Sequence, residues 1–257
     1  MKISVVINTY NAEKYLKEVL ESAKDFDEIV ICDMESTDKT REIAEKYNCR
    51  IAIFKRNGYT IAEPARTFAI QQAAYPWVLM VDADEVISEA LRKYLYDYIQ
   101  KPNCDSGIYI PRKNFFMNTF LHGGYPDRQL RFFKRDGTVW PPHVHSMPIV
   151  QGTVYKIPAK YKDLALIHLA NDSITTFVKK TNEYTDNELE KKKHKNYGIL
   201  ALLYRPLIRF FKVYILKGGF KDGVPGFINA CLLSHYQFIM VAKIIERRRS
   251  TDRVKTY

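Results

Sequence analysis

Three carboxylates follow an apolar run in the first third of the chain. Residues 77–81, WVLMV, lead directly into Asp82, Ala83, Asp84 and Glu85. Such a run is typical of a strand buried on both faces of a parallel sheet, whose ligands bind beyond the carboxyl ends of the strands. If the extended conformation continues, Asp82 and Asp84 point to the same side and suit Mg²⁺ or Mn²⁺. The same residues also fit a strand-end turn before a helix, so their spacing leaves both interpretations open.

Alternating strand and helix signals surround this motif. We expect strands at residues 3–8, 28–33, 50–55 and 77–81, and helices at residues 12–24, 36–47, 61–74 and 88–100. This order predicts an α/β fold with a Rossmann-like, mostly parallel sheet. Further strand signals at residues 108–111, 130–134 and 165–169 predict a mixed-sheet continuation. From residue 174 the pattern becomes helical, so we divide the chain into a catalytic domain, 1–172, and a helical C-terminal region, 173–257.

The positive charge of the chain is concentrated in that C-terminal region. Of the net charge of +11, residues 174–257 supply +10, with 17 Lys and Arg against 7 Asp and Glu. Nucleic acid, anionic lipid and plain solvent are all compatible with such a segment.

Two apolar segments in the C-terminal region favour a membrane surface. Within residues 197–216, Arg205, Arg209 and Lys212 form a basic stripe on an otherwise apolar helix, a pattern typical of helices in a membrane interface. Residues 227–242 carry no formal charge but are short for a span of about 20 residues. Arg247, Arg248 and Arg249 follow and suit anionic headgroups. We therefore expect peripheral membrane contact, with a helical cap on the sheet as the alternative.

The cysteines and the N-terminus indicate a compartment. The four cysteines have no paired spacing for zinc or a redox dithiol, which fits a reducing cytosol. The apolar stretch at residues 3–7 is too short for a signal peptide and reads as a first strand. We expect a cytoplasmic protein, peripheral on the inner face of the cytoplasmic membrane.

Three segments together resemble the family 2 glycosyltransferases. Residues 5–13 are similar to the opening strand and loop of that family, residues 31–40 to its second motif, and residues 82–84 to its Asp-x-Asp motif. The resemblance spans roughly residues 1–170, and it implies a glycosyltransferase A fold that binds a nucleotide sugar. Residues 65–69, 125–134 and 205–226 resemble the subgroup that contains lipopolysaccharide-core β-glucosyltransferases. That likeness implies inverting transfer of a hexose, with uridine as the expected base, to a glycolipid or lipopolysaccharide-type saccharide.

The resemblance assigns roles to residues that match the family motifs. Asp84 is expected to hold the metal at the donor diphosphate, with Asp82 at the ribose or the metal's water shell. The residues expected to contact the nucleotide-sugar donor are Thr9, Tyr10, Asn11, Asp33, Asp82, Arg66, Arg128 and Arg131. The guanidinium group of each arginine could bind phosphate through two N–H groups. Met34 and Glu35 replace the small residues that many relatives carry beside Asp33.

The remaining roles concern the proton and a second metal ligand. Asp127 matches the acidic residue of the subgroup's Pro-Asp-Arg-Gln segment and is the expected general base, with Glu85 as second choice. An ion pair with Arg128 or Arg131 is the alternative for Asp127. His145 is a candidate metal or phosphate ligand, although Ser146 stands where the subgroup often has Glu.

Two other function classes are compatible with parts of this sequence. A sugar-phosphate nucleotidyltransferase also combines an α/β sheet with acidic metal ligands, but it normally has a glycine-rich loop after the first strand. Residues 8–11, NTYN, contain no glycine. A non-enzymatic nucleic-acid or lipid-surface module would use the +10 region and would be indifferent to Asp84.

Overall fold

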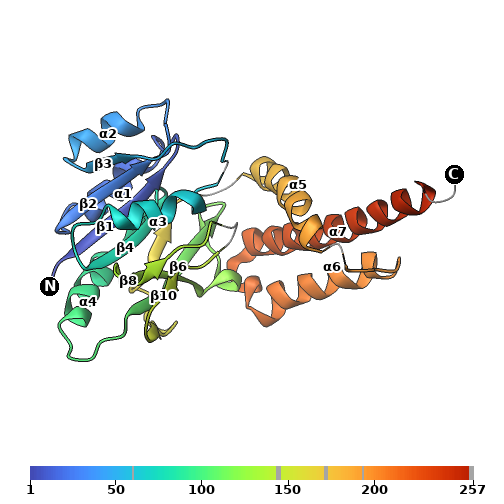
Figure 1. Cartoon of the computed structure of the whole chain (residues 1–257). Coiled ribbons are helices and arrows are strands. Elements are labelled where there is room, and N and C mark those ends of the chain that lie inside the picture. Colours follow the sequence, from blue (N-terminus) through green and yellow to red (C-terminus); the bar gives the residue numbers. More distant parts are fainter. Residues whose placement is uncertain (60, 143–145, 171–172, 193, 255–257) are drawn as a thin grey trace. The chain divides into compact units, whose positions relative to one another are not determined.

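The chain forms two compact units. The computed structural model describes residues 1–59, 61–142, 146–170, 173–192 and 194–254 (Figure 1). The first unit, here the sheet unit, comprises Met1–Lys113 and Pro126–Leu169, and the second, here the helical unit, comprises Asn114–Tyr125 and Ala170–Tyr257. The predicted division at residues 172 and 173 stays a prediction.

Strands and helices alternate through the first hundred residues, as the sequence predicts. The strands are β1 (Ile3–Thr9), β2 (Glu28–Asp33), β3 (Arg50–Ile53), β4 (Trp77–Asp82), β5 (Glu85–Ile87), β6 (Gly107–Phe116), β7 (Thr119–Phe120), β8 (Asp127–Lys134), β9 (Thr138–Val139), β10 (Ile149–Val150), β11 (Val154–Lys156) and β12 (Leu166–His168). The helices are α1 (Leu16–Ala23), α2 (Thr40–Lys46), α3 (Glu63–Gln71), α4 (Glu89–Ile99), α5 (Ile174–Lys191), α6 (Ala201–Phe211) and α7 (Gly223–Val254), with short helical turns η1 (His122–Gly124), η2 (Lys212–Leu216) and η3 (Gly219–Asp222).

The main sheet is parallel on one side and mixed on the other. Its strand order is β3-β2-β1-β4-β8-β6-β12-β5, with β7 and β11 also paired to β6. Strands β3, β2, β1 and β4 run parallel, whereas β8 is antiparallel to both β4 and β6. The prediction of an α/β fold with a mixed-sheet continuation is confirmed.

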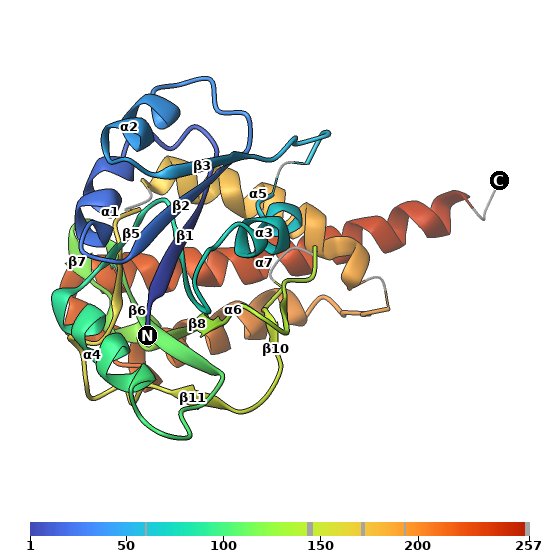
Figure 2. The same ribbon diagram turned by 60° about the vertical axis from the view of Figure 1, so that its left-hand side comes forward.

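Helices cover both faces of the parallel part, and strand alternation assigns side chains to each face. On β1, Val5 and Ile7 belong to the core cluster that includes α1 and α4, whereas Val6 belongs to the cluster that includes α3. Figure 2 shows α1 and α3 on opposite sides of β1 and β2. In α1, Leu16, Val19, Leu20 and Ala23 form one buried stripe at helical spacing.

Two of the predicted helices begin later than expected. Helix α1 begins at Leu16 rather than residue 12, and Asn11 before it has a left-handed φ of 47°. Helix α2 begins at Thr40 rather than residue 36, and polar side chains at residues 36–40 accept backbone N–H groups of the loop after β1. Asn11 N donates to Ser36 Oγ (3.0 Å) and Ala12 N donates to Thr40 Oγ1 (2.8 Å). The loops after β1 and β2 are thereby joined.

A turn interrupts the acidic motif. Strand β4 ends at Asp82, Ala83 and Asp84 form a turn, and β5 begins at Glu85. The condition under which Asp82 and Asp84 would point to the same side, a strand continuing through both, is therefore not met. Strand β5 pairs antiparallel with β12, with His168 opposite Glu85. The sequence analysis did not predict β5, which has only three residues.

The helical unit is held together by α7, which packs against both α5 and α6. Polar contacts join α7 to α5: Tyr236 donates to Glu188 Oε1 (2.8 Å) and Lys243 Nζ donates to Asp186 Oδ1 (2.6 Å). Near its start, α7 lies against η3 so closely that a Cβ on Gly226 would meet the carbonyl oxygen of Gly219 at 2.0 Å.

One helix of the described chain passes the length and composition test for a membrane span. It runs over Gly219–Ser250, and 28% of its apolar window is buried within the protein. The ion pair and hydrogen bond to α5 lie within this helix. These contacts attach α7 to α5 within the helical unit.

Candidate active site

A cleft opens at the carboxyl ends of β1 and β4. Its volume is about 510 Å³. The described residues that line it are Asn8, Tyr10, Asn11, Ala12, Lys14, Tyr15, Ala62, Arg66, Asp82, Ala83, Asp84 and His168. Because ligands of open α/β sheets bind beyond these strand ends, the cleft is the candidate active site.

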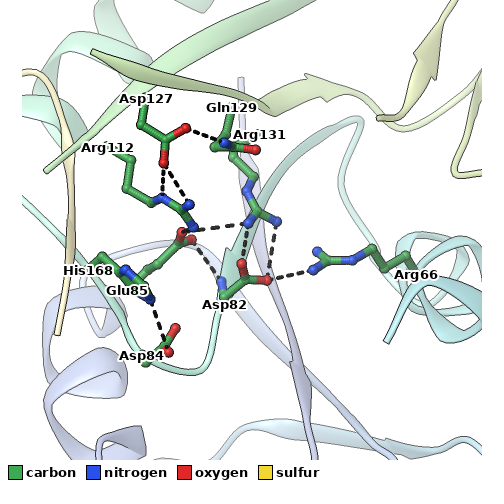
Figure 3. Close-up of polar contacts among 9 residues, drawn as sticks. All are labelled: Arg66, Asp82, Asp84, Glu85, Arg112, Asp127, Gln129, Arg131 and His168. Carbon is green, nitrogen blue, oxygen red and sulfur yellow. Dashed lines mark hydrogen bonds and ion pairs between the residues drawn. The ribbon is translucent and has the colours of Figure 1, made fainter. Parts of the chain in front are cut away.

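Asp82 is held by two arginines (Figure 3). Arg66 Nη2, on α3, donates to Asp82 Oδ1 at 2.7 Å, and Arg131, on β8, bonds both carboxylate oxygens. Burial opposes ionisation of Asp82, but the charges of Arg131 and Arg66 outweigh it and hold the pKa of this carboxyl far below its usual range. Asp82 therefore stays ionised, with much of its charge already neutralised by protein.

A second set of ion pairs extends from Glu85 to Asp127. Glu85 is fully buried, accepts the backbone N–H of Asp82 at 3.0 Å and accepts Arg112 Nη1 at 3.0 Å. The Nε and Nη2 atoms of Arg112 donate to Asp127 Oδ2 at 2.9 and 2.7 Å, and Gln129 Nε2 donates to the other oxygen at 2.8 Å. Burial lowers the pKa of Arg112, but Glu85 and Asp127 outweigh it and raise that pKa above the usual range. The network fixes the orientation of Asp127.

Asp84 has a different partner. His168 Nε2, at the end of β12, lies 3.2 Å from Asp84 Oδ2. The backbone supports this approach, because Leu169 N donates to the carbonyl oxygen of Asp84 at 2.7 Å. Both side chains are partly exposed and line the cleft. The two aspartates of the motif thus differ: arginines bind Asp82, and an imidazole approaches Asp84.

Asp33 organises the loop beyond β2. Its side chain is fully buried. Its Oδ1 accepts a hydrogen bond from the Thr9 hydroxyl (3.0 Å), and its Oδ2 accepts one from the backbone N–H of Ser36 (3.0 Å). Asn11 Oδ1 accepts the backbone N–H of Thr37 at 2.9 Å. These contacts give Asp33 a turn-forming role, and its predicted contact with the sugar donor stays a prediction.

The side chain of Asn8 is a buried amide. Its side chain is 8% exposed, lines the cleft, and neither Oδ1 nor Nδ2 has a hydrogen bond to a described residue. Asn8 pairs in register with Asp82 on β4 and lies on the same face of the sheet. An unsatisfied buried amide is costly, so Asn8 indicates a polar ligand at this point in the cleft. Nearby, the Tyr10 ring stacks under the guanidinium of Arg56, with 3.7 Å between ring centroid and Cζ.

The structure brings together some of the predicted residues and separates others. Tyr10, Asn11, Arg66, Asp82 and Asp84 line the cleft. Thr9 and Asp33 are buried and are not among the described lining residues. Arg131 contacts the lining residue Asp82.

Arg128 and Asp127 are not among the described residues that line the cleft. Arg128 follows Asp127 on β8, so alternation directs it to the face opposite Asp127, where its Nε donates to Ile157 O at 3.4 Å. Asp127 is outside the described lining and pairs with Arg112, not with the arginines that sequence analysis named. His145 lies outside the described residues.

Three residues of the site were not predicted from the sequence. His168 contacts Asp84 from a position 84 residues away in the chain. Arg112 contacts Asp127 because β6 and β8 pair antiparallel. Asn8 had one available signal, because a polar residue follows the apolar run at residues 5–7 and immediately precedes the loop.

The side chains of Asp84 and His168 suit a divalent cation only if a bound substrate supplies further ligand atoms. Among the described residues no group of three or more His, Cys, Asp or Glu side chains could hold a metal ion. Asp84 and His168 supply two ligand atoms. Mg²⁺ in nucleotide enzymes is commonly held by one or two carboxylates together with substrate phosphates and water. The residues fit a cation that arrives with a diphosphate.

Comparisons with known proteins show the family to which this chain belongs. Residues 4–162, which contain most of its lining, match the model of glycosyl transferase family 2. The lipopolysaccharide core biosynthesis glycosyltransferase LpsC of Rhizobium meliloti is 27% identical over 263 residues, covering 96% of this chain and 93% of that protein. The poly(ribitol-phosphate) beta-N-acetylglucosaminyltransferase TarS of Staphylococcus aureus is 36% identical over 115 residues, 41% of this chain and 20% of that protein.

A solved structure shares the fold. The mannosyltransferase PcManGT from Pyrobaculum calidifontis, in complex with GDP-Man and Mn²⁺, superimposes with a TM-score of 0.56 over 95% of this chain and 87% of that chain, at 12% sequence identity. The prediction of a glycosyltransferase A fold with a C-terminal helical appendage is confirmed.

Proposed function

This chain belongs to glycosyl transferase family 2, and we propose that it is an inverting, metal-dependent hexosyltransferase that uses a UDP-sugar. The observation that carries the proposal is the cleft itself. A carboxylate beside an imidazole, Asp84 and His168, faces the same space as the Asn8 amide, which has no hydrogen bond to a described residue. A nucleoside diphosphate with its cation would satisfy all three side chains.

In this proposal Asp84 and His168 hold the cation. When bound, Mg²⁺ or Mn²⁺ neutralises the charge that accumulates on the departing diphosphate. His168 takes the ligand role for which sequence analysis nominated His145. Asp82 contributes through the ribose or through water on the cation, because Arg66 and Arg131 already neutralise much of its charge.

The other donor contacts come from the loops after β1 and β2. We propose that Thr9, Tyr10, Asn11 and Asp33 shape the base and ribose site, since the hydrogen bonds between these loops fix their positions. Asn8 adds an amide that can both donate and accept. Arg66 is the arginine that lines the cleft and the first candidate for phosphate contact, with Arg131 acting through Asp82 and Arg128 as a more distant contributor.

Asp127 is proposed as the general base. As the acceptor oxygen bonds to the anomeric carbon, the bond from that carbon to the diphosphate breaks and the hydroxyl proton passes to the carboxylate. Arg112 and Gln129 orient Asp127 for this transfer. Glu85 is fully buried between two arginines and is better placed to support Asp82 and Arg112 than to meet an acceptor.

The proposed acceptor is a glycolipid or lipopolysaccharide-type saccharide, and the proposed location is the cytoplasmic face of the membrane. LpsC, similar over nearly the whole chain, is described as acting in lipopolysaccharide core biosynthesis. The apolar and basic C-terminal helices would keep the enzyme beside a lipid-linked acceptor.

A donor screen tests the proposal. Purified protein is incubated with UDP-, GDP- and other nucleotide sugars, with Mn²⁺ or with a chelator, and release of the nucleoside diphosphate is measured. We expect hydrolysis of at least one UDP-sugar, its loss with chelator, and a fall of about 10²–10³-fold in Asp84→Ala. Asp136→Ala, at an exposed aspartate of the same unit, is the matched control. Failure to turn over any nucleotide sugar would contradict the proposal, and pyrophosphate release from a nucleoside triphosphate would favour a nucleotidyltransferase.

A further inference from the structure

Helix α6 exposes a row of large apolar side chains. Leu200, Leu203, Leu207 and Phe211 are 70%, 66%, 57% and 56% exposed. Their spacing of three and four residues places them along one stripe. An apolar face of this kind on a soluble protein marks an interaction surface.

Basic residues are concentrated in the sequence around this stripe. Residues 191–221 contain nine Lys and Arg and no Asp or Glu. Arg205, Arg209 and Lys212 follow one another at four and three residues, so they form a second stripe on α6 and at the start of η2. The surface therefore complements a partner that is apolar and anionic at once.

The basic stripe lines a groove of about 300 Å³ within the helical unit. Tyr204, Arg205, Ile208, Arg209 and Lys212 form one side of the groove, and Gln237 of α7 completes it. Arg205 and Arg209 are only partly exposed, and the Nε atom of each is buried without a hydrogen-bond acceptor among the described residues. Two guanidinium groups with unused donors, an ammonium group and an amide form a site for a phosphate group.

We propose that this groove binds the phosphate headgroup of an anionic phospholipid, while Leu203, Leu207 and Phe211 insert among the acyl chains. The proposal rests on the membrane contact of the proposed function and deepens it by assigning a headgroup site. A bilayer surface is a partner that offers both phosphate and hydrocarbon, and long basic side chains reach headgroups while their stems stay apolar. A nucleic acid would satisfy the cations but leave the leucines in water.

Vesicle co-sedimentation tests the site with the full-length protein. Vesicles of zwitterionic lipid alone are compared with vesicles that contain one third anionic phospholipid. We expect the wild type to prefer the anionic vesicles, and Arg205→Gln/Arg209→Gln to lower that partition coefficient roughly 30-fold, as expected for two charges at an anionic surface. Lys160→Gln/Lys162→Gln has the same net charge, removes two exposed lysines of the sheet unit, and should change binding less than about twofold.

A third variant separates headgroup binding from misfolding. Lys212→Gln alters an exposed side chain and should weaken anionic binding about fivefold without changing the melting temperature. Wild-type binding in Arg205→Gln/Arg209→Gln, or equal losses in the lysine control, would overturn the proposal. So would wild-type protein that binds inorganic phosphate but not vesicles, because that result assigns the groove to a soluble ligand.

Donor hydrolysis without lipid distinguishes this proposal from the proposed function. The arginine variants should hydrolyse the UDP-sugar at the wild-type rate. Loss of vesicle binding with hydrolysis intact supports the headgroup site. Absence of hydrolysis in the wild type would remove the proposed function and leave the vesicle result standing.

Discussion

The sheet unit buries charges, whereas the helical unit exposes apolar side chains. In the sheet unit Glu85 and Arg131 are 0% and 4% exposed, and their charges are paired with those of Asp82 and Arg112. In the helical unit Leu203 and Leu207 of α6 are more than half exposed, and Arg205, Arg209 and Lys212 line a groove on the same helical segment. Both features oppose the usual distribution of residues between interior and surface.

In each unit these features serve the proposed role and contribute little to folding stability. Buried ion pairs contribute little net stability, because the cost of desolvation offsets the attraction between the charges. They do fix side-chain positions, which a catalytic cleft needs. An exposed apolar face contributes nothing to folding and gains its value only on contact with a partner. Mutations should therefore separate the units, with effects on stability and turnover in one and on membrane binding in the other.

Arg131→Met should give the largest effect on stability. It leaves Asp82 with one arginine and removes a cation next to Glu85, so we expect a loss of about 3–5 kcal/mol in the free energy of unfolding. Chemical denaturation followed by circular dichroism measures it. Arg92→Met, which breaks an exposed ion pair on α4, is the control and should cost less than about 1 kcal/mol. Similar losses in both variants would mean that the buried network has no special structural importance.

Asp127→Asn should act on turnover. The amide keeps the shape of the carboxylate but cannot accept the acceptor's proton, so we expect kcat for transfer to fall about 10²–10³-fold with little change in the KM for donor. Steady-state kinetics with a saccharide acceptor provide the measurement. An unchanged kcat would exclude Asp127 as the base and direct attention to Glu85.

Leu203→Asn/Leu207→Asn should act on membrane binding alone. Both leucines are exposed, so the free energy of unfolding should change by less than about 0.5 kcal/mol per site. Binding to anionic and zwitterionic vesicles should fall at least tenfold, because hydrocarbon contact is independent of headgroup charge. A large drop in melting temperature, with vesicle binding retained, would show that this stripe packs within the protein.

Asn8→Ala should have the smallest effect and the most unusual pattern. No hydrogen bond to a described residue is lost, so the melting temperature should stay equal or rise. The KM for donor should increase about 3–10-fold, the value of one hydrogen bond to ligand. A lower melting temperature with an unchanged KM would assign Asn8 a structural role.

The strands and the acidic motif could be predicted from local sequence. Apolar runs such as residues 77–81 are recognisable without knowledge of the fold, and the order of the three motifs along the chain identified the family. The predicted start of α2 was too early. Ser36 and Thr40 accept N–H groups from Asn11 and Ala12, which lie 25 and 28 residues earlier in the chain. Local cap signals do not reveal such a distant partner.

The different roles of Asp82 and Asp84 could be predicted only in part. Asp84 and His168 are separated by 84 residues, and Arg112 and Asp127 meet only because β6 and β8 pair antiparallel. Register between distant strands depends on packing of the whole sheet, which residue spacing does not encode. The headgroup groove shows the same limit, since the basic stripe was visible in the sequence but Gln237 on α7 was not.

Asp84 and His168 are proposed to hold a divalent cation when a nucleoside diphosphate is bound. Titration of Mn²⁺ in the presence of UDP, followed by the loss of the free-ion electron paramagnetic resonance signal, measures this directly. We predict one tight site in the wild type and in the control Asp136→Asn, and at least tenfold weaker binding in Asp84→Asn and in His168→Ala. Wild-type Mn²⁺ affinity in either of these two variants would contradict the account.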